Sequence, residues 1–150
     1  MTSTELLRAS IDKFTFTVPT DRAYSAEHCW IVRDGADIKV GLTDYRQQSI
    51  GDVAFVECKL AGTVLAAGED LASVETIKAN IVVPSPVAGS VSAVNAVLVD
   101  RPELVNEDCY GEGWLVLLTP AKPDDLDLLL KPTDYLALMV KEAEAAQAGR

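Results

Sequence analysis

The sequence contains one histidine and three cysteines in 150 residues, and this scarcity excludes several kinds of site. His28 is the only imidazole, and no serine lies in a Gly-x-Ser-x-Gly motif, so a nucleophilic triad lacks its usual base and its usual turn. The number of cysteines is odd, and the three residues, Cys29, Cys58 and Cys109, are widely spaced and include no Cys-x-x-Cys pair. These features argue against a disulfide framework. With His28 they make a nominal Cys₃His set, but the closely spaced ligand pairs of structural zinc sites are missing. We therefore expect half-buried thiols that pack as small apolar residues.

Long apolar runs and a positive charge balance are also missing. No hydrophobic stretch approaches the ~20 residues that span a bilayer. Residues 1–8 lack the basic start and apolar centre of a secretion signal, so we expect a cytoplasmic protein. Thirteen basic against 23 acidic residues give a net charge of −10, which repels nucleic-acid phosphates and anionic membrane surfaces. We expect neither as a partner.

Motifs for nucleotide binding and acid–base catalysis are incomplete. The sequence has no P-loop, and Gly111-Glu112-Gly113 lacks the third glycine of a dinucleotide fingerprint. Acidic residues are plentiful, but no two stand out as an acid and a base. We therefore predict no catalytic residues, although a hydrophobic fraction of 49% predicts a folded chain with a substantial core.

The chain does contain a weak internal repeat. Residues 61–71 (AGTVLAAGEDL) and 88–98 (AGSVSAVNAVL) share Ala, Gly, Val, Ala and Leu in register. Gly68 aligns with Asn95, and because both residue types tolerate a positive φ, we expect both copies to turn there. A single cation, Lys78, lies between the two copies, which suggests that this lysine is displayed.

Alternating apolar residues, Gly and Pro predict many short strands, with helices near the ends. Thr2 and Glu5 have the spacing of a capping box and predict a helix over residues 2–10. Asp34-Gly35 predicts a hairpin whose loop is longer than a two-residue turn. Strands are expected at 14–18, 29–33, 38–42, 53–58, 62–66, 70–77, 80–84, 88–93 and 114–118. Helices are expected at 44–50, as a turn near 101–105, at 123–130, and at 134–147 with Thr133 as its cap. This pattern predicts a mainly β fold, a small antiparallel β-sandwich or flattened barrel.

Lys78 falls between the strands predicted at 70–77 and 80–84, at or beside a hairpin tip. An ordinary exposed turn lysine would look the same. The small neighbour Ala79 and a long flexible stem also suit an amine to which a group is covalently attached. Both interpretations stay open on this stretch alone.

The stretch Glu75-Thr76-Ile77-Lys78-Ala79 resembles the lipoylation sequence Glu-Ser-Val-Lys-Ala of the glycine cleavage system H protein family. Further similar stretches follow in the family's order and cover about residues 27–140: VGLTDY (40–45), GDVAFVE (51–57), SPVAG (85–89), PELVN (102–106) and YGEGWL (110–115).

The resemblance implies an antiparallel β-sandwich of the lipoyl/biotinyl type (a barrel-sandwich hybrid) with short helices and a C-terminal helix. It implies one lipoyl-carrier domain over 1–150, with a core of about 27–120, an N-terminal extension at 1–26 and a C-terminal helical region at 123–147. It also implies a non-catalytic carrier in which lipoate is amide-linked to Lys78. For Glu75 it suggests recognition by the lipoylating enzyme, although an ordinary outward-facing strand residue fits equally well. Tyr110 and Trp114 are expected to pack in the core.

Several positions depart from the family pattern and leave the cargo open. The family's His-Glu-Trp is His28-Cys29-Trp30 here, its Ala-Ser-Asp after the lysine is replaced by residues 79–82 (ANIV), and a proline before Tyr-Gly is replaced by Cys109. One hypothesis is an aminomethyl carrier serving the decarboxylase, the aminomethyltransferase and the dihydrolipoamide dehydrogenase of glycine cleavage. Another is a lipoate-binding protein of bacterial sulfur oxidation, which would carry sulfur to a heterodisulfide-reductase-like complex.

Two further alternatives belong to other classes of protein. A biotinyl carrier domain resembles this fold, but its lysine is normally flanked by methionines, whereas Lys78 has Ile77 and Ala79. An unlipoylated structural or regulatory relative would keep the fold and leave the lysine unmodified.

Overall fold

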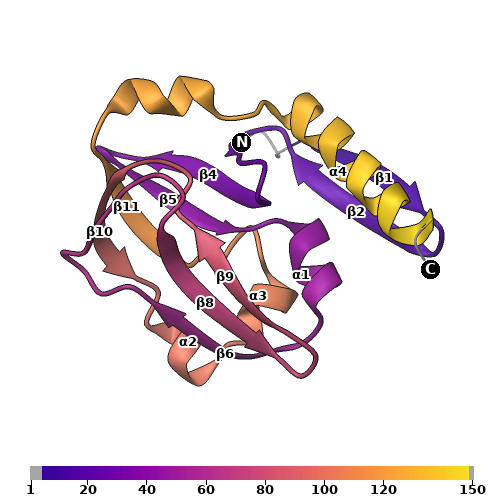
Figure 1. The fold of residues 1–150 in the computed structure, drawn as a ribbon, viewed down its shortest axis with the longest axis horizontal. Helices are drawn as coiled ribbons and strands as arrows, with labels where there is room; N and C mark the ends of the chain where they lie inside the picture. Colours follow the sequence, from indigo (N-terminus) through magenta and orange to yellow (C-terminus); the bar gives the residue numbers. More distant parts are fainter. Residues whose placement is uncertain (1–4, 149–150) are drawn as a thin grey trace.

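The computed structural model describes residues 5–148, which form three antiparallel sheets and five short to medium helices (Figure 1). The six-stranded sheet has the order β3 (Ala23–Tyr24), β4 (Cys29–Asp34), β5 (Asp37–Leu42), β11 (Val116–Pro120), β10 (Gly89–Val94) and β7 (Val64–Leu65). The three-stranded sheet has the order β6 (Val53–Cys58), β8 (Asp70–Thr76) and β9 (Asn80–Pro84). A separate hairpin consists of β1 (Leu6–Ile11) and β2 (Phe14–Pro19). The helices are α1 (Asp44–Ile50), α2 (Val97–Asp100), α3 (Leu104–Glu107), the 3₁₀ helix η1 (Pro123–Leu128) and α4 (Pro132–Ala148).

The main core lies between the six-stranded and three-stranded sheets. Its fully buried members include Ile38 and Val40 of β5, Leu71 and Val74 of β8, and Val116 of β11. Burial of each such side chain contributes roughly 1.5–3 kcal/mol to folding. This sandwich confirms the predicted mainly β architecture.

A second core lies on the other side of β4, under α4 and the β1–β2 hairpin. Ile31 of β4 packs in the main core, whereas its neighbour Trp30 packs in the second, because successive strand side chains point to opposite faces. Gly41 makes room for the indole of Trp30, since a Cβ at that position would lie 2.6 Å from the ring. The other buried residues of the second core are Phe16, Val18, Tyr24, Tyr135, Met139 and Ala143.

The two copies of the internal repeat become antiparallel neighbours, since Leu65 of β7 pairs with Gly89 of β10. Gly68 has φ +87°, as predicted from its place in the repeat. The chain also turns at Asn95, where the Leu98 N–H donates to the Asn95 carbonyl at 3.2 Å, but the φ of Asn95 is not positive. Instead its side-chain amide donates to the carbonyls of Glu112 (2.7 Å) and Trp114 (2.8 Å), which fixes the chain without a left-handed residue.

The predicted N-terminal helix is wrong over the described part of its range, where residues 6–11 form β1; residues 2–4 lie outside the described residues. The burial of β1 alternates along the strand, and Leu7, Ala9 and Ile11 pack on the second core. Pairing with β2 and this apolar face outweigh the local capping signal.

Other element boundaries differ by a few residues. Asp34 pairs with Asp37, so the β4–β5 loop is the two-residue turn Gly35-Ala36 and not a longer one. The strand predicted at 114–118 is β11 at 116–120, and α2 was not predicted. The helix predicted to begin after a Thr133 cap begins instead at Pro132.

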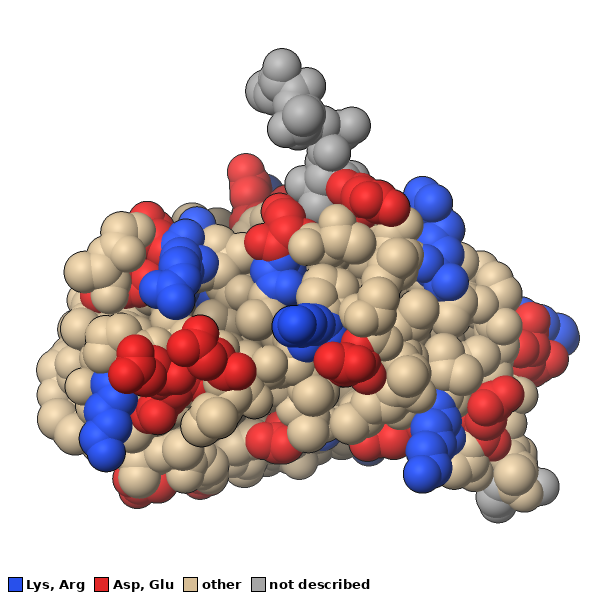
Figure 2. Space-filling model, turned by 90° about the horizontal axis from the view of Figure 1, so that it is seen from above, with Lys and Arg blue, Asp and Glu red and all other residues tan. Residues whose placement is uncertain are grey.

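Charged side chains of both signs are spread over the surface. On the face shown in Figure 2, the basic side chains lie singly among acidic ones and form no continuous area. Within residues 5–148, no helix has the length and hydropathy needed to cross a bilayer.

Candidate functional site

The loop between β8 and β9 is closed by the side chain of Thr76. Glu75 pairs with Asn80, and the loop residues Ile77, Lys78 and Ala79 project beyond this pair. The Thr76 hydroxyl accepts hydrogen bonds from the backbone N–H of Ala79 (2.9 Å) and of Lys78 (3.3 Å). The Thr76 N–H donates to the Ala79 carbonyl at 2.8 Å. Lys78 is therefore held by its backbone at the tip of a hydrogen-bonded hairpin.

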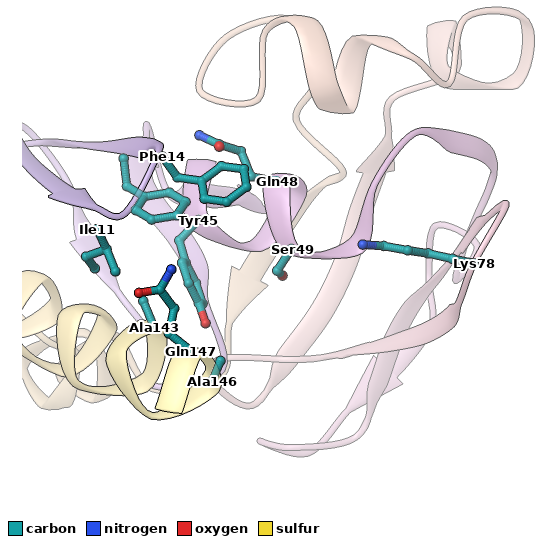
Figure 3. Close-up of a pocket in the computed structure, with 10 residues that line it drawn as sticks. Ile11, Phe14, Tyr45, Gln48, Ser49, Lys78, Ala143, Ala146 and Gln147 are labelled. Carbon is teal, nitrogen blue, oxygen red and sulfur yellow. The ribbon is translucent and has the colours of Figure 1, made fainter. Parts of the chain in front are cut away.

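The Lys78 side chain is exposed and extends from the tip toward Ser49, across the end of α1 (Figure 3). Its stem lies against Gly51, where a Cβ would be 3.2 Å from Lys78 Cε. Gly51 is held in turn by Asn106, whose amide donates to the Gly51 carbonyl at 2.9 Å. Within residues 5–148, Lys78 forms no ion pair. The structure thus presents a primary amine that is accessible, has no ion-pair partner among the described residues and is carried by a fixed backbone.

Glu75 lies on β8, one residue before Thr76, and its side chain is exposed. It pairs across the sheet with Phe55 of β6 and with Asn80 of β9. No hydrogen bond or ion pair joins Glu75 to Lys78 among the described residues. The structure therefore places the two predicted site residues near each other in the chain but not in contact.

A cavity of about 280 Å³ begins at Lys78 and runs between the N-terminal hairpin, α1 and α4. We call it the Lys78 groove. The hairpin supplies Ile11, Phe14 and Phe16. The two helices complete the lining with Tyr45, Gln48 and Ser49 of α1 and Ala143, Ala146 and Gln147 of α4. This groove could not be predicted from the sequence, because three of its four walls are distant from Lys78 in the chain.

A hydrogen-bond network that is buried except for Glu142, and that lies beside the groove residue Tyr45, was not predicted either. His28, in a left-handed conformation with φ +71°, places Nδ1 2.9 Å from the Tyr135 hydroxyl and Nε2 2.6 Å from a Glu142 carboxylate oxygen. The Thr43 hydroxyl lies 2.7 Å from the same Tyr135 oxygen. A neutral ring with its proton on Nε2 satisfies every member: Thr43 donates to Tyr135, Tyr135 to Nδ1, and Nε2–H to Glu142.

The protonation of His28 is set mainly by its burial. Burial lowers the pKa of His28 from 6.5, although the hydrogen bond and charge of Glu142 act to raise it. The ring of Tyr45, which lines the groove, lies 5.0 Å from the His28 ring. His28 thus ties α4 to the body of the protein and supports one wall of the groove.

The cysteines are more deeply buried than predicted. Cys29 and Cys109 are buried, and only Cys58 is half-buried. Burial raises the pKa of Cys29 and of Cys109 to about 12, and that of Cys58 to about 11. Among the described residues, no three His, Cys, Asp or Glu side chains are arranged to hold a metal ion.

Tyr110 and Trp114 are partly buried against the second core, as predicted for packing residues. Tyr110 also has a bonding role, because its hydroxyl donates to the Thr17 carbonyl at 2.6 Å and accepts from the Asp44 N–H at 3.0 Å.

Comparison with known proteins places the chain in one family. The sequence model of the glycine cleavage H-protein family matches residues 22–142. The chain is 42% identical over 127 residues to the glycine cleavage system H protein of Carboxydothermus hydrogenoformans, covering 85% of this chain and 98% of that protein. It is 43% identical over 126 residues to the H protein of Thermus thermophilus, covering 84% and 98%. The crystal structure of a glycine cleavage system H protein from Mycobacterium marinum superposes with a TM-score of 0.71 at 32% identity, covering 89% of this chain and 100% of that one.

Proposed function

Because the chain belongs to the glycine cleavage H-protein family, we propose that it is a lipoyl carrier whose lipoate is amide-linked to Lys78. The observation that carries the proposal is the position of this amine: exposed, free of ion pairs within residues 5–148, and displayed at the tip of a closed hairpin. These three properties suit an enzyme that acylates a lysine, since the amine must be reachable and nucleophilic once deprotonated, and it must be carried by a backbone that holds its position.

The residues around Lys78 fit an attached lipoyl group. Acylation removes the ammonium charge, and no described carboxylate loses a partner when this happens. The Lys78 stem already lies against Gly51 and leads into the groove. Thr76 holds the loop backbone while the side chain stays free to swing. For Glu75, we propose recognition by the lipoylating enzyme, supported by its exposure on β8 three residues before the lysine.

When bound, lipoate would supply a five-membered disulfide ring that cannot reach the preferred dihedral angle near 90°, so the ring is readily reduced to two thiols by two electrons and two protons, which it gives up to an oxidant on closure. The protein's own contribution is then to display and orient this group. We propose that it has no catalytic residue of its own and that partner enzymes supply the acid–base chemistry.

Two cargoes remain, and each is favoured by one observation. The names of the relatives favour an aminomethyl group passed between the decarboxylase and the aminomethyltransferase of glycine cleavage, with a dihydrolipoamide dehydrogenase as the oxidant. The departures from the family pattern just after Lys78, at residues 80–82, favour a sulfur cargo delivered to a heterodisulfide-reductase-like complex. Either role places the carrier among soluble partner enzymes in the cytoplasm.

The intact mass of the protein after expression in its native host tests the attachment. We expect one lipoyl increment, and Lys78→Arg should remove it while preserving the positive charge and the fold. A biotinyl increment, no increment, or an increment that persists in Lys78→Arg would each overturn the proposal.

A second measurement separates the cargoes. The lipoylated protein is offered to glycine decarboxylase with glycine and labelled carbon dioxide. Exchange of the label into glycine would support the aminomethyl role, and its absence, with a known H protein as the positive control, would exclude that role.

A further inference from the structure

Asn106, on α3, forms three side-chain hydrogen bonds that join it to two other segments of the chain. Its amide nitrogen donates to the Gly51 carbonyl at 2.9 Å and to the Gln47 side-chain oxygen at 3.1 Å. Its oxygen accepts from the Val53 N–H at 2.9 Å. Gly51 directly follows the last residue of α1, and Val53 is the first residue of β6. One side chain therefore holds both ends of the short connection between α1 and β6.

The orientation of the Asn106 amide is fixed by its partners. The Val53 N–H only donates and requires the amide oxygen, whereas the Gly51 carbonyl only accepts and requires the nitrogen. Gln47 is oriented in turn, because its nitrogen donates to a carboxylate oxygen of Asp44 at 2.9 Å and leaves its oxygen for Asn106. A reversed amide would place like groups against each other at all three contacts.

An asparagine is matched to these three partners by its chemistry as well as its size. Aspartate has the same shape but only accepts, so it would turn a second oxygen toward the Gly51 carbonyl. Leucine has a similar shape without polar atoms, and the N–H of the buried Val53 would lose its partner. The α1–β6 connection therefore depends on the particular pattern of donors and acceptor that Asn106 supplies.

This connection is the surface beneath the Lys78 side chain. A Cβ on Gly51 would lie 3.2 Å from Lys78 Cε, 3.7 Å from Cδ and 3.9 Å from Cγ, so the stem passes over Gly51 along most of its length. Figure 3 shows this side chain extended toward the end of α1. The Lys78 backbone is held separately, by the Thr76 hydroxyl. A lysine without such a surface samples many directions, because its stem has several rotatable bonds.

We infer that Asn106 is a positioning residue for the acylation of Lys78: it holds Gly51 under the lysine stem and so limits the directions in which the amine points. The inference rests on the proposed attachment to Lys78. Asn106 acts only through Gly51 and touches none of the reacting atoms. Its effect is to raise the fraction of molecules whose amine is already directed away from the protein along one path, toward an acylating enzyme.

This role predicts a specific kinetic effect. When only a fraction of the molecules is competent to bind, the apparent affinity falls by that fraction, whereas the step that follows binding is unchanged. Loss of the Asn106 hydrogen bonds should therefore raise the KM of an acylating enzyme for the carrier and leave kcat unchanged. A side chain that only stabilised the fold would change neither constant while the protein stayed folded.

The test measures lipoylation of the full chain by an ATP-dependent lipoate ligase, with lipoate and ATP present and the carrier concentration varied. The ligase forms lipoyl adenylate, and the neutral Lys78 amine attacks its carbonyl carbon. A C–N bond forms, AMP leaves with the electrons of the broken C–O bond, and one proton is released. Intact mass follows the product. We expect Asn106→Asp to raise KM at least fivefold and to keep kcat within twofold of the parent.

Asn95→Asp is the matched control. Asn95 is a buried asparagine whose amide also donates to two carbonyls, those of Glu112 and Trp114, and these partners are not part of the α1–β6 connection. The same exchange there should lower the free energy of unfolding, measured in urea, and should leave KM within twofold of the parent. If Asn106→Asp does not fold, Asn106→Ser takes its place, because the shorter side chain reaches at most one of the three partners.

A second measurement reports the position of the side chain directly. With ¹³C-labelled lysine, the nuclear Overhauser contact between the Lys78 Cε protons and the Gly51 Cα protons measures how long the stem rests on Gly51. We expect this contact in the unmodified parent, an equal contact in Asn95→Asp, and a contact at least threefold weaker in the Asn106 variant.

The outcomes distinguish this inference from the proposed function. A parent chain that gains no lipoyl mass at Lys78 would overturn the attachment itself. A parent that is lipoylated, together with an Asn106 variant whose KM stays within twofold, would overturn only the positioning role. A rise of KM in Asn95→Asp as large as that in the Asn106 variant would assign the effect to stability and would overturn the positioning role as well.

Discussion

Gly51 forms the surface on which the Lys78 side chain rests. A Cβ on Gly51 would lie 3.2 Å from Lys78 Cε and 3.7 Å from Cδ. The two residues are far apart in the sequence, and they meet because α1 ends where the β8–β9 hairpin reaches its tip. Gly51 combines φ +82° with ψ −164°, a region that is essentially restricted to glycine. One residue thus satisfies a backbone requirement and shapes the approach to the lysine.

Gly51→Ala should destabilise the protein by about 1–3 kcal/mol, because alanine is strained in this conformation. It should also shift the NMR signal of Lys78 Cε, since the added methyl group displaces the flexible end of that side chain. Gly35→Ala is the control: its φ of +64° makes it strained too, but a Cβ there meets nothing within 4 Å. Urea unfolding measures the stability of both variants. A Lys78 shift of equal size in Gly35→Ala would contradict the contact.

Thr76 should control the order of the loop that carries Lys78. Thr76→Val keeps the side-chain shape and removes the acceptor for two N–H groups, at a cost of about 0.5–1.5 kcal/mol per hydrogen bond. We expect the amides of Lys78 and Ala79 to exchange with solvent several-fold faster, as measured by hydrogen exchange with NMR detection. Thr76→Ser restores the hydroxyl and should restore slow exchange. If serine exchanged as fast as valine, packing of the Thr76 methyl would hold the loop instead.

The sequence predicted the elements whose signals are local. Lys78 could be placed at a hairpin tip because strand-forming runs flank it on both sides, and α1 could be placed because Gly51 ends its pattern. Even there the cap was not predicted: the Thr43 hydroxyl accepts from the Arg46 N–H. The strand β1 is determined by tertiary contacts. Its alternating residues pack on α4 and pair with β2, whereas the nearby Thr2 and Glu5 resemble the start of a helix.

The sequence pointed to Lys78 but not to the groove beside it. The groove depends on Phe14, Tyr45 and Ala143 meeting Lys78, and no short-range pattern records such contacts. His28 likewise looked unremarkable as a lone histidine, because its partners Tyr135 and Glu142 lie more than a hundred residues away. Distances of this kind are set by the fold and not by spacing in the chain.

His28 should make the protein less stable in mild acid. Because burial lowers its pKa in the folded state, the unfolded chain, with a pKa near 6.5, binds more protons as the pH falls below about 6.5. The free energy of unfolding therefore decreases from pH 7 toward pH 5. The charges that act on His28 are those of Glu142, Arg46 and Glu27.

His28→Asn isolates this contribution, because asparagine tolerates the positive φ and does not titrate. The variant should be less stable than the parent at pH 7, where the hydrogen bonds to Tyr135 and Glu142 are altered. Its stability should fall less between pH 7 and pH 5. Urea unfolding followed by tryptophan fluorescence at each pH measures the two slopes. Equal slopes in parent and variant would assign the acid sensitivity to carboxylates instead.

The three cysteines should not react detectably with thiol reagents in the native protein. With a pKa of about 11 for Cys58 and about 12 for Cys29 and Cys109, roughly one thiol in a thousand or fewer is ionised at pH 8. Burial also blocks the approach of a reagent to Cys29 and Cys109. A chromogenic disulfide should therefore titrate no fast-reacting thiol in the unmodified protein and all three in denaturant.

Lipoylation should change that titration in a specific way. After mild reduction, the lipoylated protein should show two fast-reacting thiols, and Lys78→Arg, expressed in the same way, should show none. Cys58→Ser removes the only half-buried cysteine and should leave the count of two unchanged. A fast thiol in the unmodified native protein would mean that the sheet around Cys58 opens on the timescale of the reagent. Two fast thiols that survive in Lys78→Arg would place the reactive sulfur elsewhere in the protein, and the carrier assignment of Lys78 would fail with them.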